Sequence, residues 1–178
     1  LSIGNGKLFI ADSESSTVRT IDLKSDATAT LVGGEDAEPR NLFAFGDVDG
    51  IGEKARLQHD LGVLWLEASS RVAVADTYNH RLKLLDPAKK EVVRWIGSGK
   101  PGLRDGKGLE AQFSEPSGFA LAPGGDRIYI ADTNNHKIRI ADLKTLEVTT
   151  LKLQGVPRPL SPVAPRSARL ADLPGTVE

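Results

Sequence analysis

The chain has no cysteine and no methionine among its 178 residues. Without cysteine it cannot form disulfides, thiolate metal sites or a cysteine nucleophile. Residue 1 is leucine rather than methionine, so we expect the chain to be a piece of a longer protein. No stretch approaches 18 consecutive apolar residues, which predicts no membrane-spanning helix and no direct membrane insertion.

An excess of charge of one sign is also lacking. The 23 basic and 24 acidic residues leave a net charge of −1, and aromatic residues make up only 5% of the chain. Binding to nucleic acid relies on positive charge and, for single strands, on aromatic stacking. The composition therefore predicts no nucleic-acid partner.

What the chain does contain is internal repetition, the signature of a repeat fold. The segment Ala75–Lys83 reads ADTYNHRLK, and 56 positions later Ala131–Arg139 reads ADTNNHKIR. A weaker copy, Ala11–Arg19, reads ADSESSTVR and lies 64 positions before the first of these. The additional residues of the longer spacing fall most naturally in the polar stretch Glu35–Phe45.

Each copy contains short segments in which apolar and polar residues alternate, which is the period of a β-strand. No long segment shows the spacing of three and four that an amphipathic helix requires. In the second and third copies we predict strands at Leu61–Leu66, Arg71–Ala75, Arg81–Asp86, Glu91–Ile96, Gly118–Ala122, Arg127–Ala131, Lys137–Asp142 and Glu147–Leu151.

Four antiparallel strands in each repeat are typical of a propeller blade. The prediction is an all-β fold, a partial β-propeller of about three four-stranded blades at residues 1–34, 35–98 and 99–153. A β-sandwich is the alternative, but a sandwich does not require its turns to recur in sequence. Five of the ten prolines lie after residue 153, so residues 154–178 are predicted to be a Pro-rich linker or tail.

We name the four strands of each blade a, b, c and d in chain order. Because successive strands run in opposite directions, the b–c turn and the loop from strand d to the next strand a lie at the same end of each blade. Because loops on a rigid scaffold usually carry function, we predict that a protein partner binds at this end. The candidate partner-binding residues belong to the two repeated turns: Tyr78, Asn79, His80, Arg81, Asn134, Asn135, His136 and Lys137.

A second set of residues is predicted to shape turns. Asp12, Asp76 and Asp132 follow strand b in all three copies, and an aspartate there accepts hydrogen bonds from the N–H groups of the following turn. Recurrence in every copy favours an architectural role over catalysis. The glycines of the long loops complete this set, and we expect them at the b–c end: Gly50, Gly52, Gly106 and Gly108.

The sequence shows no metal-ligand set and no catalytic set. His80 and His136 occupy equivalent places, but a zinc site needs three or four converging ligands and His59 lies elsewhere in the repeat. The segment Asp47–Gly52 resembles the start of a calcium loop, yet Ile51 stands where the third oxygen ligand belongs. We therefore predict no metal, no cofactor and no enzymatic activity for this chain.

Several motifs resemble NHL repeats: the glycine-rich loops Gly46–Ala55 and Gly102–Ala111, the segment Glu115–Gly118, and the two ADTxNH turns. The resemblance covers about residues 1–153 and implies a six-bladed propeller, so that the remaining blades of the same propeller are expected partners. In the first copy Ser13–Ser16 departs from the motif.

The long blades and the segment Leu153–Pro159 further resemble the plastid suppressor-of-quenching proteins, and animal proteins that join thioredoxin-like and NHL domains are similar too. This resemblance implies a thioredoxin-linked protein on the lumen side of the chloroplast thylakoid that regulates photoprotective quenching. Our hypothesis is a non-catalytic interaction and scaffold module. Two alternatives remain open, part of a metal-dependent NHL-propeller lyase and an RNA-binding NHL propeller.

Overall fold

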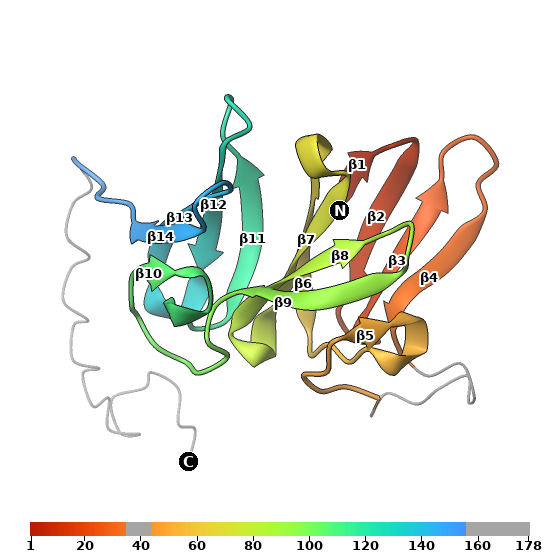
Figure 1. Cartoon of the computed structure of the whole chain (residues 1–178), viewed down its shortest axis with the longest axis horizontal. Coiled ribbons are helices and arrows are strands. Elements are labelled where there is room, and N and C mark those ends of the chain that lie inside the picture. The colour runs from red at the N-terminus through yellow and green to blue at the C-terminus, as the bar shows by residue number, and fades with distance from the viewer. Residues whose placement is uncertain (35–43, 156–178) are drawn as a thin grey trace, which may run out of the picture.

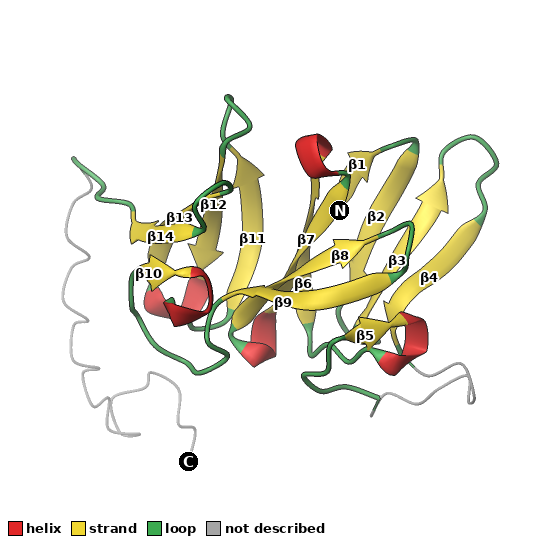
Figure 2. Cartoon of the chain, viewed as in Figure 1, coloured by secondary structure: helices red, strands yellow, loops and turns green. Residues whose placement is uncertain are grey.

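The computed structural model describes residues 1–34 and 44–155, which form three antiparallel sheets that follow one another along the chain. The sheets stand side by side as blades 1, 2 and 3 (Figure 1), and only short 3-10 turns interrupt the strands and loops (Figure 2). The predicted all-β fold is confirmed, and the observed arrangement is that of a partial propeller. No helix within the described residues is long and apolar enough to cross a bilayer.

The strand bounds follow the alternation of the sequence closely. In blades 2 and 3 every predicted strand begins and ends within about two residues of the observed one. Blade 1 consists of β1 (Ser2–Gly4), β2 (Lys7–Asp12), β3 (Thr17–Asp22) and β4 (Thr28–Gly33). Blade 2 contains β6 (Asp60–Leu66), β7 (Arg71–Asp76), β8 (Arg81–Asp86) and β9 (Glu91–Ile96), and blade 3 contains β11 (Pro116–Leu121), β12 (Arg127–Asp132), β13 (Lys137–Asp142) and β14 (Glu147–Thr150).

Blades 2 and 3 each carry a fifth, very short strand that the sequence did not predict. In blade 2 it is β5 (Gly50–Ile51), which pairs with β9, and in blade 3 it is β10 (Gly106–Lys107), which pairs with β14. The long loop therefore adds an outer edge to its own blade. The predicted insertion falls largely on residues 35–43 and the Pro-rich tail on residues from 156 onward, and both lie outside the described residues.

The middle blade is buried on both faces, because each face packs against a neighbouring blade. Along β7, Val72 and Val74 belong to the core shared with blade 1, whereas Ala73 and Ala75 belong to the core shared with blade 3. All four side chains are 0% exposed. The alternation that predicts a strand thus also divides its side chains between two interfaces.

The innermost strands of blades 2 and 3 approach each other very closely at Gly62. A Cβ atom added to Gly62 would lie 2.1 Å from the carbonyl oxygen of Ser117 in β11. A side chain at this position would push the two blades apart. Glycine is needed here for the close contact of two backbones rather than for an unusual φ angle.

Candidate functional site: the b–c end of the blades

The turns between strands b and c close with the same backbone hydrogen bond and end on the same backbone conformation in all three blades. In blades 2 and 3 they are 3-10 turns, η3 (Thr77–Asn79) and η5 (Thr133–Asn135). Each turn ends on a residue in the left-handed region: Ser16 has φ of 50°, His80 of 51° and His136 of 52°. The departure of the first copy from the sequence motif therefore leaves the form of the turn unchanged.

The aspartate before each full turn ties it to the long loop that opens the same blade. Asp76 Oδ1 accepts the backbone N–H of Gln58 at 2.7 Å, and Asp132 Oδ1 accepts that of Ser114 at 2.8 Å. Both aspartates are 0% exposed. The donors expected from the sequence were the amides of the following turn. They are instead loop amides that lie 18 positions earlier in the chain.

The second asparagine of each turn is also used within the fold. Asn79 donates from Nδ2 to Asp76 Oδ2 at 2.9 Å and to the carbonyl oxygen of Gly46 at 2.7 Å. Asn135 repeats both bonds with Asp132, at 2.9 Å, and with Gly102, at 2.8 Å. These two candidate residues hold the start of the long loop against the turn.

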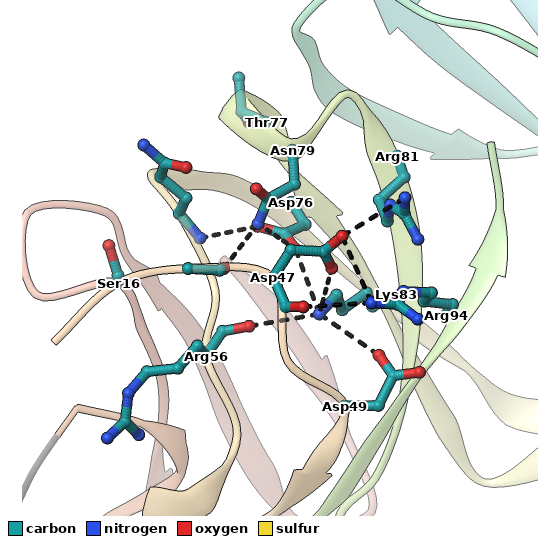
Figure 3. Close-up of polar contacts among 12 residues, drawn as sticks. Ser16, Asp47, Asp49, Arg56, Asp76, Thr77, Asn79, Arg81, Lys83 and Arg94 are labelled. Atoms are coloured by element: carbon teal, nitrogen blue, oxygen red, sulfur yellow. Dashed lines mark hydrogen bonds and ion pairs between the residues drawn. The ribbon is translucent and has the colours of Figure 1, made fainter. Parts of the chain in front are cut away.

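A buried cation completes the network in blade 2 (Figure 3). Lys83 in β8 is 0% exposed, and its Nζ lies 3.0 Å from Asp47, 3.3 Å from Asp49 and 3.5 Å from Asp76. It also donates to the carbonyl oxygen of Arg56 at 3.2 Å. One ammonium group thus joins strand c, the b–c turn and both arms of the long loop.

In blade 3 a buried arginine joins the corresponding elements. Arg139, which is 56 positions after Lys83, is fully buried and contacts Asp132 at 2.7 Å and Asp105 at 2.8 Å. It also donates to the carbonyl oxygens of Arg104 and Gln112, each at 2.9 Å. Our sequence analysis did not single out these cations. The available signal was a positive charge at the same strand position of each copy, where the neighbouring residues are apolar.

In blade 1 the corresponding pair is solvent-accessible. Arg19 Nε lies 2.7 Å from Asp12 Oδ2, and the side chains are 45% and 33% exposed. The position in the blade is the same, but the pair is not enclosed as it is in blades 2 and 3.

The pKa values of the acids around Lys83 reflect burial and charge. Burial raises the pKa of Asp76 to about 6, although Lys83 and Asn79 oppose the shift. Burial alone would also raise the pKa of Asp47, but its hydrogen bond to Lys83 and the nearby cations hold that pKa below its ordinary value. Asp76 is therefore protonated before Asp47 as the pH falls.

A further buried acid lies at the start of β6. Asp60 is 0% exposed, and neither carboxylate oxygen has a hydrogen-bond partner among the described residues. Burial raises its pKa to about 9, with smaller contributions from the charges of Asp76 and Asp12. Asp60 is therefore uncharged at neutral pH. Blade 3 has Pro116 in the equivalent place, so this acid is not part of the repeated architecture.

His80 connects blade 2 to blade 3. Its Nδ1 accepts the backbone N–H of Glu115 at 3.2 Å, just before the innermost strand of the next blade. At the junction of blades 1 and 2, Ser16 Oγ accepts the backbone N–H of His59 at 3.2 Å. A serine and a histidine thus make the same bond at successive junctions, which gives His80 a structural role.

Arg81 is likewise occupied. It is only 7% exposed, donates from Nη2 to the carbonyl oxygen of Ser98 at 2.8 Å and lies 3.3 Å from Asp47. The four candidate residues that remain exposed are Tyr78, Asn134, His136 and Lys137.

The long loop does not stay at the b–c end, contrary to our expectation for its glycines. It starts there at Gly46 but then runs along the outer edge of blade 2, where Gly52 donates to the carbonyl oxygen of Lys90 in the c–d turn at 2.8 Å. Gly50 pairs with Val92 on the way. In blade 3, Gly106 pairs with Val148 and Gly108 donates to Leu146 at 2.9 Å. The expectation failed because strand pairing carries the loop to the opposite end.

Gly52 and Gly108 each have a positive φ, of 57° and 53°. This left-handed backbone makes glycine favourable at both tips of the long loops.

His59, which appeared unrelated to the turns, lies beside one of them. The rings of His59 and Tyr78 are 4.5 Å apart between centroids. Tyr78 is 47% exposed, and its backbone N–H donates to the carbonyl oxygen of Gln58 at 3.1 Å. The exposed ring of Tyr78 therefore packs against the ring of His59, and its backbone is bonded to the long loop. Within the described residues, no group of three or more His, Asp or Glu side chains is arranged to hold a metal ion.

Successive antiparallel sheets of one pattern, packed face to face, define this chain as a segment of a β-propeller. Two solved structures share its fold. One is a Bacteroides thetaiotaomicron structural genomics protein of unknown function, with a TM-score of 0.62, 18% identity, and coverage of 86% of this chain and 35% of that one. The other is an auxiliary nutrient binding protein of the same species, with a TM-score of 0.60, 21% identity, and coverage of 83% and 35%.

The sequence comparisons identify the family. Residues 113–141 match the NHL repeat model. The chain is 48% identical over 147 residues to NHL repeat-containing protein 2 of Homo sapiens, covering 82% of this chain and 20% of that protein. It is 46% identical over 165 residues to Protein SUPPRESSOR OF QUENCHING 1, chloroplastic, of Arabidopsis thaliana, covering 91% and 15%. The chain belongs to the NHL-repeat proteins, and it spans a fifth or less of the length of these relatives.

Proposed function

We propose that this chain is a non-catalytic protein-interaction module whose partner binds the b–c end of blades 2 and 3. The observation that carries the proposal is Tyr78, an aromatic side chain that is half exposed yet held by His59. Exposed aromatic residues that are already ordered lose little entropy on binding, and they are enriched among the residues that dominate binding energy.

The surroundings of Tyr78 fit an interface. Leu61 is 52% exposed, and its backbone N–H donates to the side chain of Thr77, the residue before Tyr78. Leu61 and Tyr78 are therefore two exposed apolar residues at the same turn, and they form the apolar centre of the proposed surface. The exposed polar side chains Asn134, His136 and Lys137 lie on the adjacent blade and supply donors around that centre. An apolar centre with a polar border is the usual composition of a protein–protein interface.

A cross-linking experiment tests the proposal. A photoreactive amino acid placed at Asn134 should capture a partner, and the affinity of the purified partner is then measured for two variants. Tyr78→Asn introduces the residue that blade 3 carries in the equivalent turn, so the fold should tolerate it. We expect binding at least about tenfold weaker, the effect of losing a dominant interface residue.

The matched control is Leu23→Ala, which removes an exposed apolar side chain at the opposite end of blade 1. Equal weakening by Tyr78→Asn and Leu23→Ala, or unchanged affinity in Tyr78→Asn, would refute the proposed surface.

The remaining blades of the same propeller are proposed to cover the outer face of blade 3. Its half-buried side chains Tyr129, Ala131, Ile138 and Ile140 occupy the sheet positions that in blade 2 pack against blade 3. A further blade of the same kind fits this surface through the same contacts.

We also propose that the module is part of a thioredoxin-linked thylakoid protein that acts in photoprotective quenching. The support is its identity to the Arabidopsis protein, whose name gives both the quenching role and the chloroplast. The test is a tagged full-length protein in isolated thylakoids. Protection from added protease until the membrane is opened supports a lumenal position, and absence from the chloroplast contradicts it.

A further inference from the structure

The two blade junctions differ in how their a–b ends are filled. At the junction of blades 1 and 2, Phe9 and Trp65 stack with ring centroids 5.3 Å apart and planes 7° apart. The indole of Trp65 lies directly over Gly4, where an added Cβ would be 2.1 Å from the ring. Both aromatic side chains are buried, so this end of the junction is closed by a ring pair.

At the junction of blades 2 and 3 the same sheet positions carry small side chains. Trp65 faces Val72 across its strand pair, and the equivalent pair in blade 3 is Leu121 with Ile128. The sheet position of Phe9 is taken by Ala73 in blade 2. Two stacked rings are thus replaced by an isobutyl group and a methyl group.

A cavity of about 520 Å³ lies at this junction. Its walls are mostly apolar, with Leu66, Leu84, Trp95, Leu121 and Leu143 around it and the Gly124–Gly125 turn at its edge. Trp95 and Leu143 are half-buried, and Leu121 is 39% exposed, so the cavity opens to solvent. Its volume falls in the range of sites that bind small ligands and side-chain anchors.

We propose that this pocket binds an aromatic side chain, tryptophan above all, that projects from a segment of a partner protein. The neighbouring junction shows that this architecture accommodates a flat indole between two blades. Trp95 offers the incoming ring an aromatic surface, and aromatic pairs gain energy beyond the burial of area. The chain's own residues 156–178 contain no aromatic residue that could serve instead.

This site is distinct from the proposed b–c surface, because the a–b turns that border it lie at the opposite end of the strands. A partner could bind either surface alone, so the failure of one proposal, the b–c surface or the pocket, would not contradict the other.

The test uses the 178-residue chain and its two indole N–H signals in NMR spectra. The probe is a blocked pentapeptide with a central tryptophan and serine or glycine elsewhere, and the comparison peptide has leucine in the centre. We expect a saturable shift of the Trp95 signal with the first peptide and at least fivefold weaker binding of the second. Trp65, which is enclosed at the other junction, serves as the internal reference.

Filling the pocket from within should abolish binding. Leu121→Trp restores the residue found at the neighbouring junction, and Leu103→Trp adds the same side chain at an exposed position outside the pocket. We expect loss of binding in the first variant and unchanged binding in the second. If Leu121→Trp disturbs the Trp65 signal, the variant Trp95→Leu is used in its place. Peptide binding to Trp95→Leu is then followed by the backbone amide signals, and we expect it to be at least fivefold weaker.

The proposal would be overturned by the absence of a saturable shift, by equal binding of the two peptides, or by undiminished binding after the pocket is filled. A concentration-dependent shift without peptide, lost in Leu121→Trp, would identify a second copy of the chain as the occupant and would also overturn it.

Discussion

A cation of strand c contacts the aspartate before the b–c turn in each blade, and its burial differs between the blades. The three blades therefore allow a test of how much burial contributes to holding the long loops. Arg139, Lys83 and Arg19 occupy the same strand position in blades 3, 2 and 1, and their side chains are 0%, 0% and 45% exposed. Replacing each by methionine keeps most of the side-chain volume and removes the charge. The same chemical change is thus made in two enclosed sites and one open site.

The structure sets the expected size of each effect. Removing Arg139 leaves Asp132, which is 0% exposed, as a buried acid without its cation, and breaking such a pair costs about 3–5 kcal/mol. We expect a similar cost for Lys83→Met, which leaves Asp76 in the same position. Arg19→Met breaks an exposed pair with Asp12, and such pairs contribute about 0–1 kcal/mol.

The assay is the free energy of unfolding in urea followed by far-ultraviolet circular dichroism, because blade 3 contains no tryptophan. The double variant Arg139→Met with Asp132→Asn should cost clearly less than the sum of its single changes, since it leaves no unpaired buried charge. Equal costs for Arg139→Met and Arg19→Met would show instead that burial has no bearing on the role of these cations.

Two further predictions concern the b–c end. The pKa of Asp60 is raised to about 9, so the folded state keeps a proton that the unfolded chain releases near pH 4, and stability should fall between these values by up to about 1.4 kcal/mol per pH unit. Asp60→Asn should remove this slope in urea titrations at pH 7, 8 and 9, above the raised pKa of Asp76, and an unchanged slope there would contradict the assignment. His80→Ser should keep the hydrogen bond between blades, because Ser16 makes the equivalent bond at the other junction. We expect His80→Ser to change the free energy of unfolding by less than about 0.5 kcal/mol, and His80→Ala, which loses the bond, to lower it by about 1 kcal/mol. Thermal melts that rank the serine variant below the alanine variant would show that the bond is not shared.

The strands and their grouping into blades follow from the sequence because both are encoded locally. Alternating side chains such as Val72 to Ala75 must face two interfaces, and the offset of 56 residues repeats the whole pattern. The fold class and the strand bounds could therefore be predicted, and the family was recognised separately, from the resemblance of the loop and turn motifs to NHL repeats. The short strands β5 and β10 could not, since a two-residue pairing has no periodicity to detect.

The division of the turn residues into structural and exposed sets was also beyond the sequence. Asn79 and Tyr78 are adjacent in one motif, yet the first is bonded to Gly46, 33 positions away, and the second points outward. Such long-range bonds depend on the path of the loop, which a local pattern does not contain. For the same reason His59 could not be paired with Tyr78 before the strands were assembled.

The repeats stack as blades through their innermost strands, and a pair of matched glycines offers a direct test of this stacking. Gly62 and Gly118 are 56 positions apart and occupy the same place in β6 and β11. A Cβ at Gly62 would lie 2.1 Å from Ser117 O, whereas the nearest atom to a Cβ at Gly118 is the Cβ of Ala131 at 4.0 Å.

The measurement is the free energy of unfolding of Gly62→Ala and Gly118→Ala in this chain. Stacked blades predict a loss of about 1–3 kcal/mol for Gly62→Ala, the usual cost of forcing atoms into a packed interior, and a change below about 0.5 kcal/mol for Gly118→Ala. Equal effects of the two substitutions would contradict the proposed stacking.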